Sequence, residues 1–188
     1  MSNIWITSDW HFCHSKDFIY KPRGFSSFEE MNAAIIEKHN TVVQPEDEVY
    51  CLGDCMLENN EKGLECIKAL NGKIHIIRGN HDSNTRAELY KSCNNVVEVC
   101  DGKYLKAGKQ SFFLSHFPSI TTNSDTDKPL SRRMINLCGH SHTSNKFLDF
   151  EKGLIYHCEV DAHNCAPINI ENILNDIKTN IEVTCSNE

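Results

Sequence analysis

The amino-acid sequence predicts an α/β domain built in layers around one or more mixed β-sheets. Strand-like and helical patterns alternate through the first half of the chain, and strand-like patterns dominate the second half. This order of elements is typical of layered α/β folds. The chain has 188 residues, of which 39% are hydrophobic. Such a length and composition suit a single domain over residues 1–188, with at most a small appendage.

The first half of the chain supplies the alternating pattern. Short apolar runs that end in polar turns predict strands over residues 3–7, 47–52 and 73–77. Apolar residues at helical spacing predict helices over residues 28–40, 61–70 and 85–91. Ser27 followed by Glu30 resembles a capping box, which marks the start of the first helix. Residues 12–26, which contain Pro22 and Gly24, are expected to form a loop.

The second half of the chain is richer in strands. Apolar and β-branched runs predict strands over residues 96–100, 104–106, 111–115 and 134–138. Residues 147–150 and 154–159 resemble a hairpin that turns at Glu151-Lys152-Gly153, and residues 170–178 resemble a helix. Residues 117–133 are polar and show no periodicity, so we expect a long loop there.

Polar side chains follow five of the predicted strands, at the point where each strand ends. Seven of them carry an oxygen or nitrogen atom that can bind a metal ion: Asp9, His11, Asp54, Asn80, His116, His140 and His142. Sites in open α/β sheets form outside the carboxyl ends of the strands. We therefore expect these seven side chains to meet in space.

The types of donor indicate the metal. Two carboxylates, one amide and four imidazoles suit borderline divalent transition metals better than magnesium or calcium. Seven ligands are too many for one ion, but they fit two ions if one carboxylate is shared. Two ions about 3.5–4 Å apart are a common arrangement for displacement at phosphorus. The sequence therefore predicts two divalent ions, chosen from manganese, iron, zinc and nickel.

The order of these motifs resembles a known family. The chain contains D-x-H at Asp9, G-D at Asp54, G-N-H-D at residues 79–82, a single His116, and G-H-x-H at residues 139–142. This ordered set resembles the calcineurin-like metallophosphoesterase superfamily, and most of all its small stand-alone bacterial and phage members. The resemblance implies an α/β fold in which two mixed β-sheets pack as a sandwich flanked by helices. The gaps between the motifs are short, so we expect no separate cap domain.

The resemblance also implies roles for single residues. Asp9, His11 and His142 would hold the first metal ion; Asn80, His116 and His140 would hold the second; Asp54 would bridge the two. His81 would face the phosphate as a catalytic residue, either protonating the leaving oxygen or stabilising charge. Asp82 would orient the His81 ring.

The expected activity is metal-dependent hydrolysis of a small phosphate ester, with a water molecule activated between the two metal ions as the nucleophile. The alternatives are a nuclease, a cyclic-nucleotide phosphodiesterase, or a non-enzymatic metal-dependent interaction module on the same scaffold. The complete ligand set and the presence of His81 favour the enzyme. We favour a phosphodiester substrate over a monoester, because two ions neutralise its single charge without further cations. A monoester would need extra positive charge, which Arg132 and Arg133 in the long loop would supply.

Charge and cysteine content limit the partners and the location. The net charge of −7 and the isoelectric point of about 5.8 argue against binding to long nucleic acids. No apolar run approaches the length that spans a bilayer, and no secretory signal is visible, so we expect no membrane partner. Many of the ten cysteines lie inside apolar runs, which favours free thiols and a cytoplasmic protein. The oligomeric state is not indicated.

The sequence leaves the roles of several polar residues open. His14 lies close enough to His11 to touch a substrate, but an exposed loop position is equally compatible. Arg23 is a candidate phosphate clamp or an exposed loop residue. Asp161 and His163 follow the last predicted strand and are candidates for a supporting position near the site.

Overall fold

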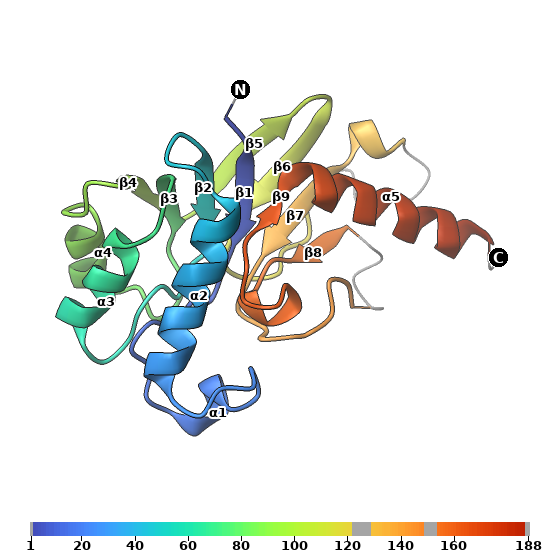
Figure 1. Cartoon of the computed structure of the whole chain (residues 1–188). Helices are drawn as coiled ribbons and strands as arrows, with labels where there is room; N and C mark the ends of the chain where they lie inside the picture. The colour runs from blue at the N-terminus through green and yellow to red at the C-terminus, as the bar shows by residue number, and fades with distance from the viewer. Residues whose placement is uncertain (1, 122–128, 149–153, 187–188) are drawn as a thin grey trace.

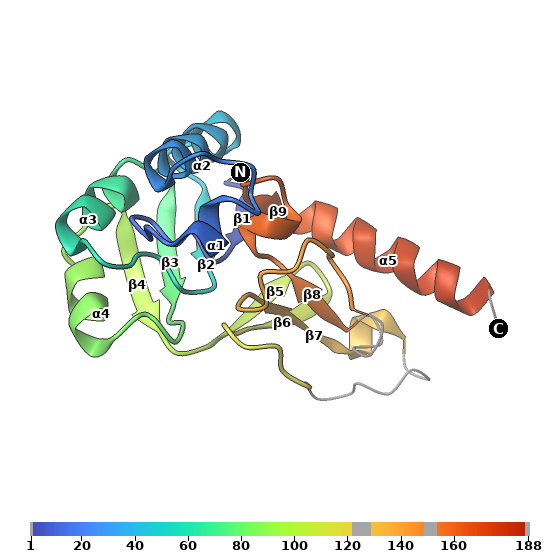
Figure 2. The same cartoon turned by 90° about the horizontal axis from the view of Figure 1, so that it is seen from below.

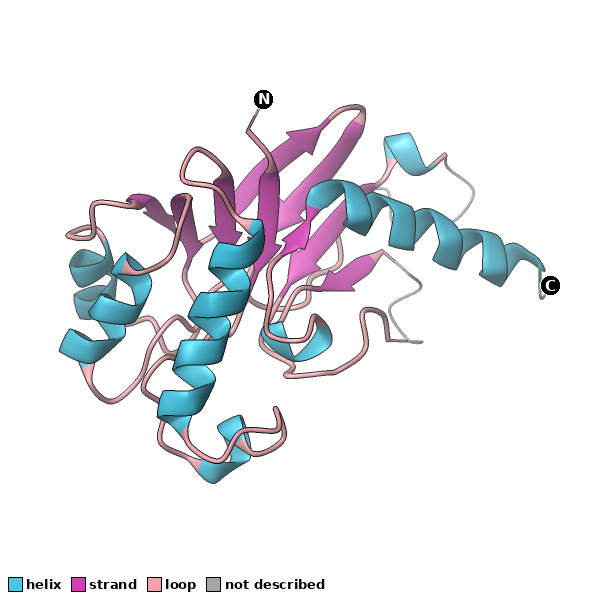
Figure 3. Ribbon diagram, viewed as in Figure 1, coloured by secondary structure: helices cyan, strands magenta, loops and turns pink. Residues whose placement is uncertain are grey.

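The computed structural model describes residues 2–121, 129–148 and 154–186, with side chains described as far as residue 180 (Figure 1). It contains two mixed β-sheets (Figure 3). The first sheet has five strands in the spatial order β4 (Val96–Cys100), β3 (Lys73–Ile77), β2 (Glu48–Cys51), β1 (Ile4–Thr7) and β9 (Ile168–Asn169). The strands β1 to β4 run parallel, and β9 is antiparallel to β1.

The second sheet has four strands. Its spatial order is β5 (Lys103–Ala107), β6 (Gln110–Leu114), β7 (Met134–Cys138) and β8 (Ile155–His157). The strands β5 and β6 form an antiparallel hairpin, whereas β6, β7 and β8 run parallel. The predicted sandwich of two mixed sheets flanked by helices is therefore confirmed (Figure 2).

The helices cover the first sheet on its outer face. They are α2 (Phe28–Val42), α3 (Asn60–Lys68) and α4 (Asn84–Tyr90). The first sheet lies between these helices and the second sheet. Its central strands are therefore buried on both faces, as parallel strands commonly are. In β2, Val49 and Cys51 pack in the core under the helices, whereas Tyr50 packs in the core between the sheets. The alternation follows from the period of two in a strand.

The last helix, α5 (Ile170–Ser186), extends the core between the sheets. Its residues Ile173 and Ile177 are fully buried in that core. The hydroxyl of Tyr156 in β8 donates a hydrogen bond of 2.6 Å to the Asp176 carboxylate and so ties the helix to the second sheet. Within the described part of the chain, no helix combines the length and the apolar character that crossing a bilayer requires.

The start of α2 fits the capping box in part. Ser27 Oγ accepts a hydrogen bond of 3.2 Å from the Glu30 amide, as expected. The Glu30 carboxylate reaches back one residue further than the motif predicts and accepts a hydrogen bond of 2.8 Å from the Ser26 amide. Both bonds satisfy amide groups near the helix start that the helix itself leaves unpaired.

Several expected elements differ from the structure. The predicted loop over residues 12–26 contains a short helix, α1 (Asp17–Tyr20), and the two-residue strand β9 was not predicted. The expected hairpin is wrong where it can be judged, because β8 pairs in parallel with β7 and residues 147 and 148 are not in a strand; residues 149–153 lie outside the described residues. Helix α5 continues eight residues beyond the predicted end at residue 178, to Ser186.

The expected long loop over residues 117–133 contains one turn of 3-10 helix, η1 (Leu130–Arg132), directly before β7. Residues 122–128 of this loop lie outside the described residues. A second 3-10 turn, η3 (Val160–Ala162), follows β8. These turns lie at opposite ends of the second sheet, because β7 and β8 are parallel and η1 precedes a strand whereas η3 follows one.

Candidate metal centre

The candidate site lies where five strands end. Asp9 and His11 follow β1, Asp54 follows β2, Asn80 follows β3, His116 follows β6, and His140 and His142 follow β7. The backbone there is unusual, because five of these seven residues have a positive φ angle between 47° and 75°: Asp9, His11, Asp54, His140 and His142. Such angles are uncommon outside glycine and cost on the order of 1 kcal/mol or more each. Their concentration at one edge points to a functional site.

Glycines allow the loops of the site to approach one another. A Cβ atom on Gly79 would lie 2.2 Å from Oδ1 of Asp54, and a Cβ atom on Gly139 would lie 2.3 Å from Oδ2 of Asp9. Any side chain at these two positions would push an acidic residue out of place. The glycines in the motifs G-N-H-D and G-H-x-H are therefore required by the packing of the loops.

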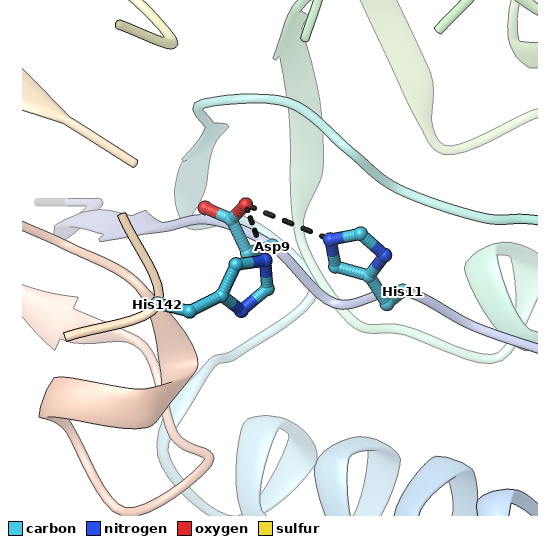
Figure 4. Close-up of side chains that lie close together, drawn as sticks. All are labelled: Asp9, His11 and His142. Carbon is cyan, nitrogen blue, oxygen red and sulfur yellow. Dashed lines mark ion pairs between the residues drawn. The ribbon is translucent and has the colours of Figure 1, made fainter. Parts of the chain in front are cut away.

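One group of donors gathers around Asp9. The Asp9 Oδ1 atom lies 3.7 Å from Nε2 of His11 and 3.6 Å from Nε2 of His142. Figure 4 shows both rings turned toward that oxygen. The ligand atoms of these three residues all lie within 4.8 Å of one another, which is close enough to hold one metal ion. The other Asp9 oxygen accepts a hydrogen bond of 2.9 Å from the His140 amide, which fixes the carboxylate.

A second group gathers around Asn80. Its Oδ1 atom lies 2.9 Å from Nε2 of His116 and 3.0 Å from Nδ1 of His140, and the two ring nitrogens lie 3.2 Å apart. The other ring nitrogen of His116, Nδ1, donates a hydrogen bond of 2.8 Å to the carbonyl oxygen of Leu52. That bond leaves the lone pair of Nε2 directed at the group, as a metal-binding histidine requires.

Asp54 lies between the two groups. Its Oδ2 atom is 3.7 Å from Nε2 of His11 in the first group and 3.5 Å from Nε2 of His116 in the second. Its side chain is 2% exposed. A single buried oxygen that faces a nitrogen of each group has the position of a bridging ligand.

The residues of the first group fit a metal ion. Asp9 Oδ1 and His11 Nε2 are buried, and neither has a hydrogen-bond partner among the described residues. Unpaired buried polar atoms are costly, so a cluster of them that face one point indicates a cation that completes it. The mixed oxygen and nitrogen donors suit a divalent transition metal.

The protonation states also suit metal binding. Burial raises the pKa of Asp9, but the neighbouring His11 and His142 rings outweigh burial and leave that pKa lowered. Burial lowers the pKa of His11 despite the attraction of Asp9. Asp9 is thus held ionised and His11 neutral, and these are the forms that bind a cation.

His81 lies above this centre and is partly exposed. Its side chain is 42% exposed, and its Nε2 atom lies 3.9 Å from Oδ2 of Asp54. The His81 amide donates a hydrogen bond of 2.9 Å to Asp54 Oδ1, so the Asp54 carboxylate fixes the backbone that carries the ring. The ring therefore stands at the solvent side of the site, where a substrate would bind.

Asp82 does not have the role expected for it. Its Oδ2 atom accepts hydrogen bonds from the amides of Asp54 at 2.7 Å and Gly79 at 2.9 Å. Its Oδ1 atom accepts bonds from the Cys55 amide at 3.2 Å and the Tyr90 hydroxyl at 2.6 Å. The expectation that Asp82 orients the His81 ring is therefore corrected: this carboxylate joins the loops after β2 and β3.

Arg23 and Asp161 support the first group from behind. The Arg23 side chain is 1% exposed, and its Nε and Nη2 atoms donate hydrogen bonds of 2.9 and 2.8 Å to the two oxygens of Asp161. Nη2 also donates a bond of 2.9 Å to the carbonyl oxygen of Asp9. Asp161 Oδ2 lies 3.2 Å from Nδ1 of His142 and can accept its proton, which turns Nε2 toward Asp9.

This buried network decides two roles that the sequence left open. Arg23 is neither exposed nor free to clamp a phosphate, because its guanidinium group is enclosed by protein acceptors. Asp161 has the supporting position that its place after the last strand suggested. Burial lowers the pKa of His142, but the hydrogen bond to Asp161 and the charge of Asp9 outweigh burial and raise it.

The structure also places His14 and His163, whose roles the sequence left open. His14 is buried, and its Nδ1 atom lies 3.0 Å from Nδ1 of His11, so it supports a ligand from the side away from Asp9. His163 donates through Nε2 to the carbonyl oxygen of His157 at 2.8 Å and stacks on Tyr156. It packs against the second sheet and does not take part in the site.

Arg132 and Arg133 are placed far from the donors. They come directly before β7, whose five residues separate them from the histidines that follow it. A strand of five residues spans roughly 17 Å. The carbonyl oxygen of Arg133 accepts a hydrogen bond of 2.7 Å from Gln110 at the start of β6. Arg133 therefore lies at the end of the sheet opposite the donors. The phosphate clamp considered for this pair is therefore not supported.

Two features of the site were not found from the sequence. Arg86 in α4 donates a hydrogen bond of 2.7 Å to the carbonyl oxygen of His81, and it follows no motif. Phe117 is 50% exposed directly after His116. The signal that the sequence offers for Phe117 is an aromatic residue directly after a predicted ligand, His116.

The chain is similar to a described family along most of its length. The model of the calcineurin-like phosphoesterase superfamily domain matches residues 3–156. An uncharacterized protein of Methanocaldococcus jannaschii is 46% identical over 84 residues, which are 44% of this chain and 48% of that protein. The match thus spans about half the length of that relative.

Two further relatives cover more of the chain. The gene 66 protein of Mycobacterium phage L5 is 28% identical over 166 residues, with 76% of this chain and 79% of that protein aligned. The crystal structure of a protein of unknown function from Aquifex aeolicus superposes with a TM-score of 0.72 at 24% identity, over 93% of this chain and 99% of that one. The last comparison establishes a common fold.

Proposed function

The chain belongs to the calcineurin-like phosphoesterase superfamily, and from this premise we propose that it hydrolyses a small phosphate ester at a centre of two divalent metal ions. The position of Asp54 supports the proposal most directly. Its Oδ2 atom lies 3.7 Å from a nitrogen of one donor group and 3.5 Å from a nitrogen of the other. One carboxylate oxygen shared by two groups is what a dinuclear centre requires.

The residues would divide as follows. Asp9, His11 and His142 would hold the first ion; Asn80, His116 and His140 would hold the second; Asp54 would be common to both. When bound, the two ions supply positive charge to the phosphoryl oxygens and make a water molecule more acidic. Manganese, iron, zinc and nickel all suit this donor set.

The remaining residues would position the ester and handle its protons. His81 is the catalytic residue we propose, because its ring is partly exposed beside Asp54 and is free to give a proton to the leaving oxygen. Asp82 would act through the backbone, since it holds the amides of Asp54 and Gly79. Asp161 and Arg23 would keep His142 in the orientation that binds the metal.

We propose a phosphodiester as the preferred substrate. A phosphomonoester would need further positive charge for its second negative charge. Three arginines that were candidates for this role are not available to it. Arg23 is enclosed by Asp161 and by backbone carbonyls, and Arg132 and Arg133 lie at the other edge of the second sheet. A single negative charge makes a smaller demand on further cations. We infer a cytoplasmic location as well, since buried free thiols such as Cys51 and Cys158 suit a reducing compartment.

The proposed function is tested by turnover. The protein is stripped with a chelator, reloaded with manganese, zinc or nickel, and assayed on bis-p-nitrophenyl phosphate and p-nitrophenyl phosphate. We expect metal-dependent hydrolysis with a higher kcat/KM for the diester. Asp54→Asn should abolish it. A monoester preference of tenfold, about 1.4 kcal/mol at the transition state, would overturn the substrate preference. Metal-loaded protein without activity on any phosphate ester would overturn the function.

A further inference from the structure

A cavity adjoins the second group of donors. Its volume is about 410 Å³, within the range of small-molecule sites. Asn80 and His116 line it on the side of the metal centre. The rest of its lining includes Arg78, Asp101, Phe113, Ser115, Phe117 and Ser119. A phosphate at the metal centre would therefore have this cavity beside it.

The aromatic part of the lining is fixed and exposed. Phe117 is 50% exposed, and its ring meets His116 and His140 edge-on, with centroids 5.0 and 4.7 Å apart. Its carbonyl oxygen accepts hydrogen bonds from the hydroxyls of Ser115 at 2.8 Å and Ser119 at 2.9 Å. The backbone thus presents a large apolar ring to solvent in one position.

The polar part of the lining is also fixed. Arg78 Nε donates a hydrogen bond of 2.7 Å to Asp101, and its Nη1 donates one of 2.6 Å to Asn84. These bonds hold the flat guanidinium group in place, and such a group stacks well on aromatic rings. The apolar side chains among the described lining residues are Phe113 and Phe117, with no aliphatic residue beside them. The lining therefore matches a planar ring with polar edges better than a flexible alkyl chain.

We propose that this cavity binds the organic group of the phosphate ester and selects a planar aromatic ring, such as a nucleobase or another aryl group. The inference rests on the proposed function, because the metal centre has to hold the phosphate. Phe117 would be the residue that determines specificity, by stacking against the ring of the substrate. Stacking of a base on an aromatic side chain commonly raises affinity by about tenfold or more.

The test uses phosphonates, in which a P–C bond replaces the ester bond. They cannot be hydrolysed, and they resemble the monoester that hydrolysis of a phosphodiester releases. The dissociation constants of the methylene analogue of AMP, benzylphosphonate and butylphosphonate are measured by calorimetry on the metal-loaded protein. We expect at least one aromatic phosphonate to bind tenfold more tightly than butylphosphonate. A preference for the AMP analogue would identify a nucleobase as the ligand, and a preference for benzylphosphonate would identify a smaller aryl group.

Variants then locate the preference. Phe117→Ala should remove the aromatic advantage and leave butylphosphonate affinity within about twofold, whereas Phe117→Trp should retain it. Phe18→Ala is the matched control, since Phe18 is 70% exposed and contacts His14 on the side of the first group. Equal affinity for all three phosphonates, or an advantage that survives Phe117→Ala, would overturn the subsite and leave the phosphoesterase intact. Loss of metal-dependent binding for every phosphonate would instead contradict the proposed function, and the subsite with it.

Discussion

The carboxylate of Asp82 accepts a 2.7 Å hydrogen bond from the backbone amide of Asp54, and this bond joins the loops that follow β2 and β3. Asp54 has a φ angle of 53°, in the left-handed region that is uncommon outside glycine. The bond to Asp82 helps to hold that conformation. The acidic residue of the G-N-H-D motif thus holds the backbone of Asp54 and not the ring of the neighbouring histidine.

Replacing Asp82 is therefore expected to affect folding and metal binding together. Asp82→Asn turns an amide NH₂ toward N–H donors and should lower the free energy of unfolding by about 1–3 kcal/mol. Tyr90→Phe removes a single hydroxyl from the same carboxylate and should cost about 1 kcal/mol. Urea denaturation and metal titration of both variants check this. If Asp82→Asn kept its stability and metal affinity but lost turnover alone, a role in orienting His81 would be restored.

The buried pair of Arg23 and Asp161 gives a second prediction. Arg23→Met leaves Asp161 without its partner, so the free energy of unfolding should fall by about 3–5 kcal/mol. Asp161→Asn should also weaken metal binding about 10- to 100-fold, because it loosens the His142 ring. A double-mutant cycle with Arg23→Met and Asp161→Asn should show strong coupling. Additive losses would mean that the two side chains act separately.

The sequence predicted the seven candidate metal ligands better than the residues that hold those ligands in place. Strand ends are visible in the pattern, and parallel strands bring their ends to one edge, so the seven donors could be grouped from the sequence alone. The Arg23–Asp161 pair could not be read, because the two residues are 138 positions apart and lie in loops whose course no periodicity records. The hairpin predicted before residue 159 failed because apolar alternation does not distinguish parallel from antiparallel pairing.

His81 provides a test of catalysis that is separate from metal binding. His81→Ala should retain the metal content and stability of the parent but lose turnover by about 10²–10⁴-fold, the usual contribution of a positioned proton donor. His75→Ala is the control, since His75 lies in β3 between Glu48 and Glu98 and outside the site. Parental turnover in His81→Ala would remove His81 from the mechanism.

The free energy of unfolding should depend on pH through His39, which is not one of the proposed metal ligands. Burial lowers its pKa to about 4, while its Nε2 donates to the carbonyl oxygen of Asn71. The unfolded chain takes up this proton below pH 6.5 and the folded chain only near pH 4, so folding weakens as the pH falls through that window. The loss is at most about 3 kcal/mol.

The measurement compares the parent with His39→Gln, which keeps a donor for Asn71 but does not titrate. Between pH 6.5 and 4, the free energy of unfolding of the parent should fall more steeply than that of the variant. Because the proposed metal ligands are the same in both proteins, their own pH dependence cancels in the difference. Parallel curves would show that His39 does not contribute.

The number and the positions of the metal ions test the proposed dinuclear centre most directly. The protein is purified without chelator, its metal content is determined by elemental analysis, and crystals are measured for anomalous scattering at the metal edge. We expect two ions about 3.5–4 Å apart, with the Asp54 carboxylate in contact with both. A single ion at full occupancy, with Asp54 turned away from it, would contradict the dinuclear centre.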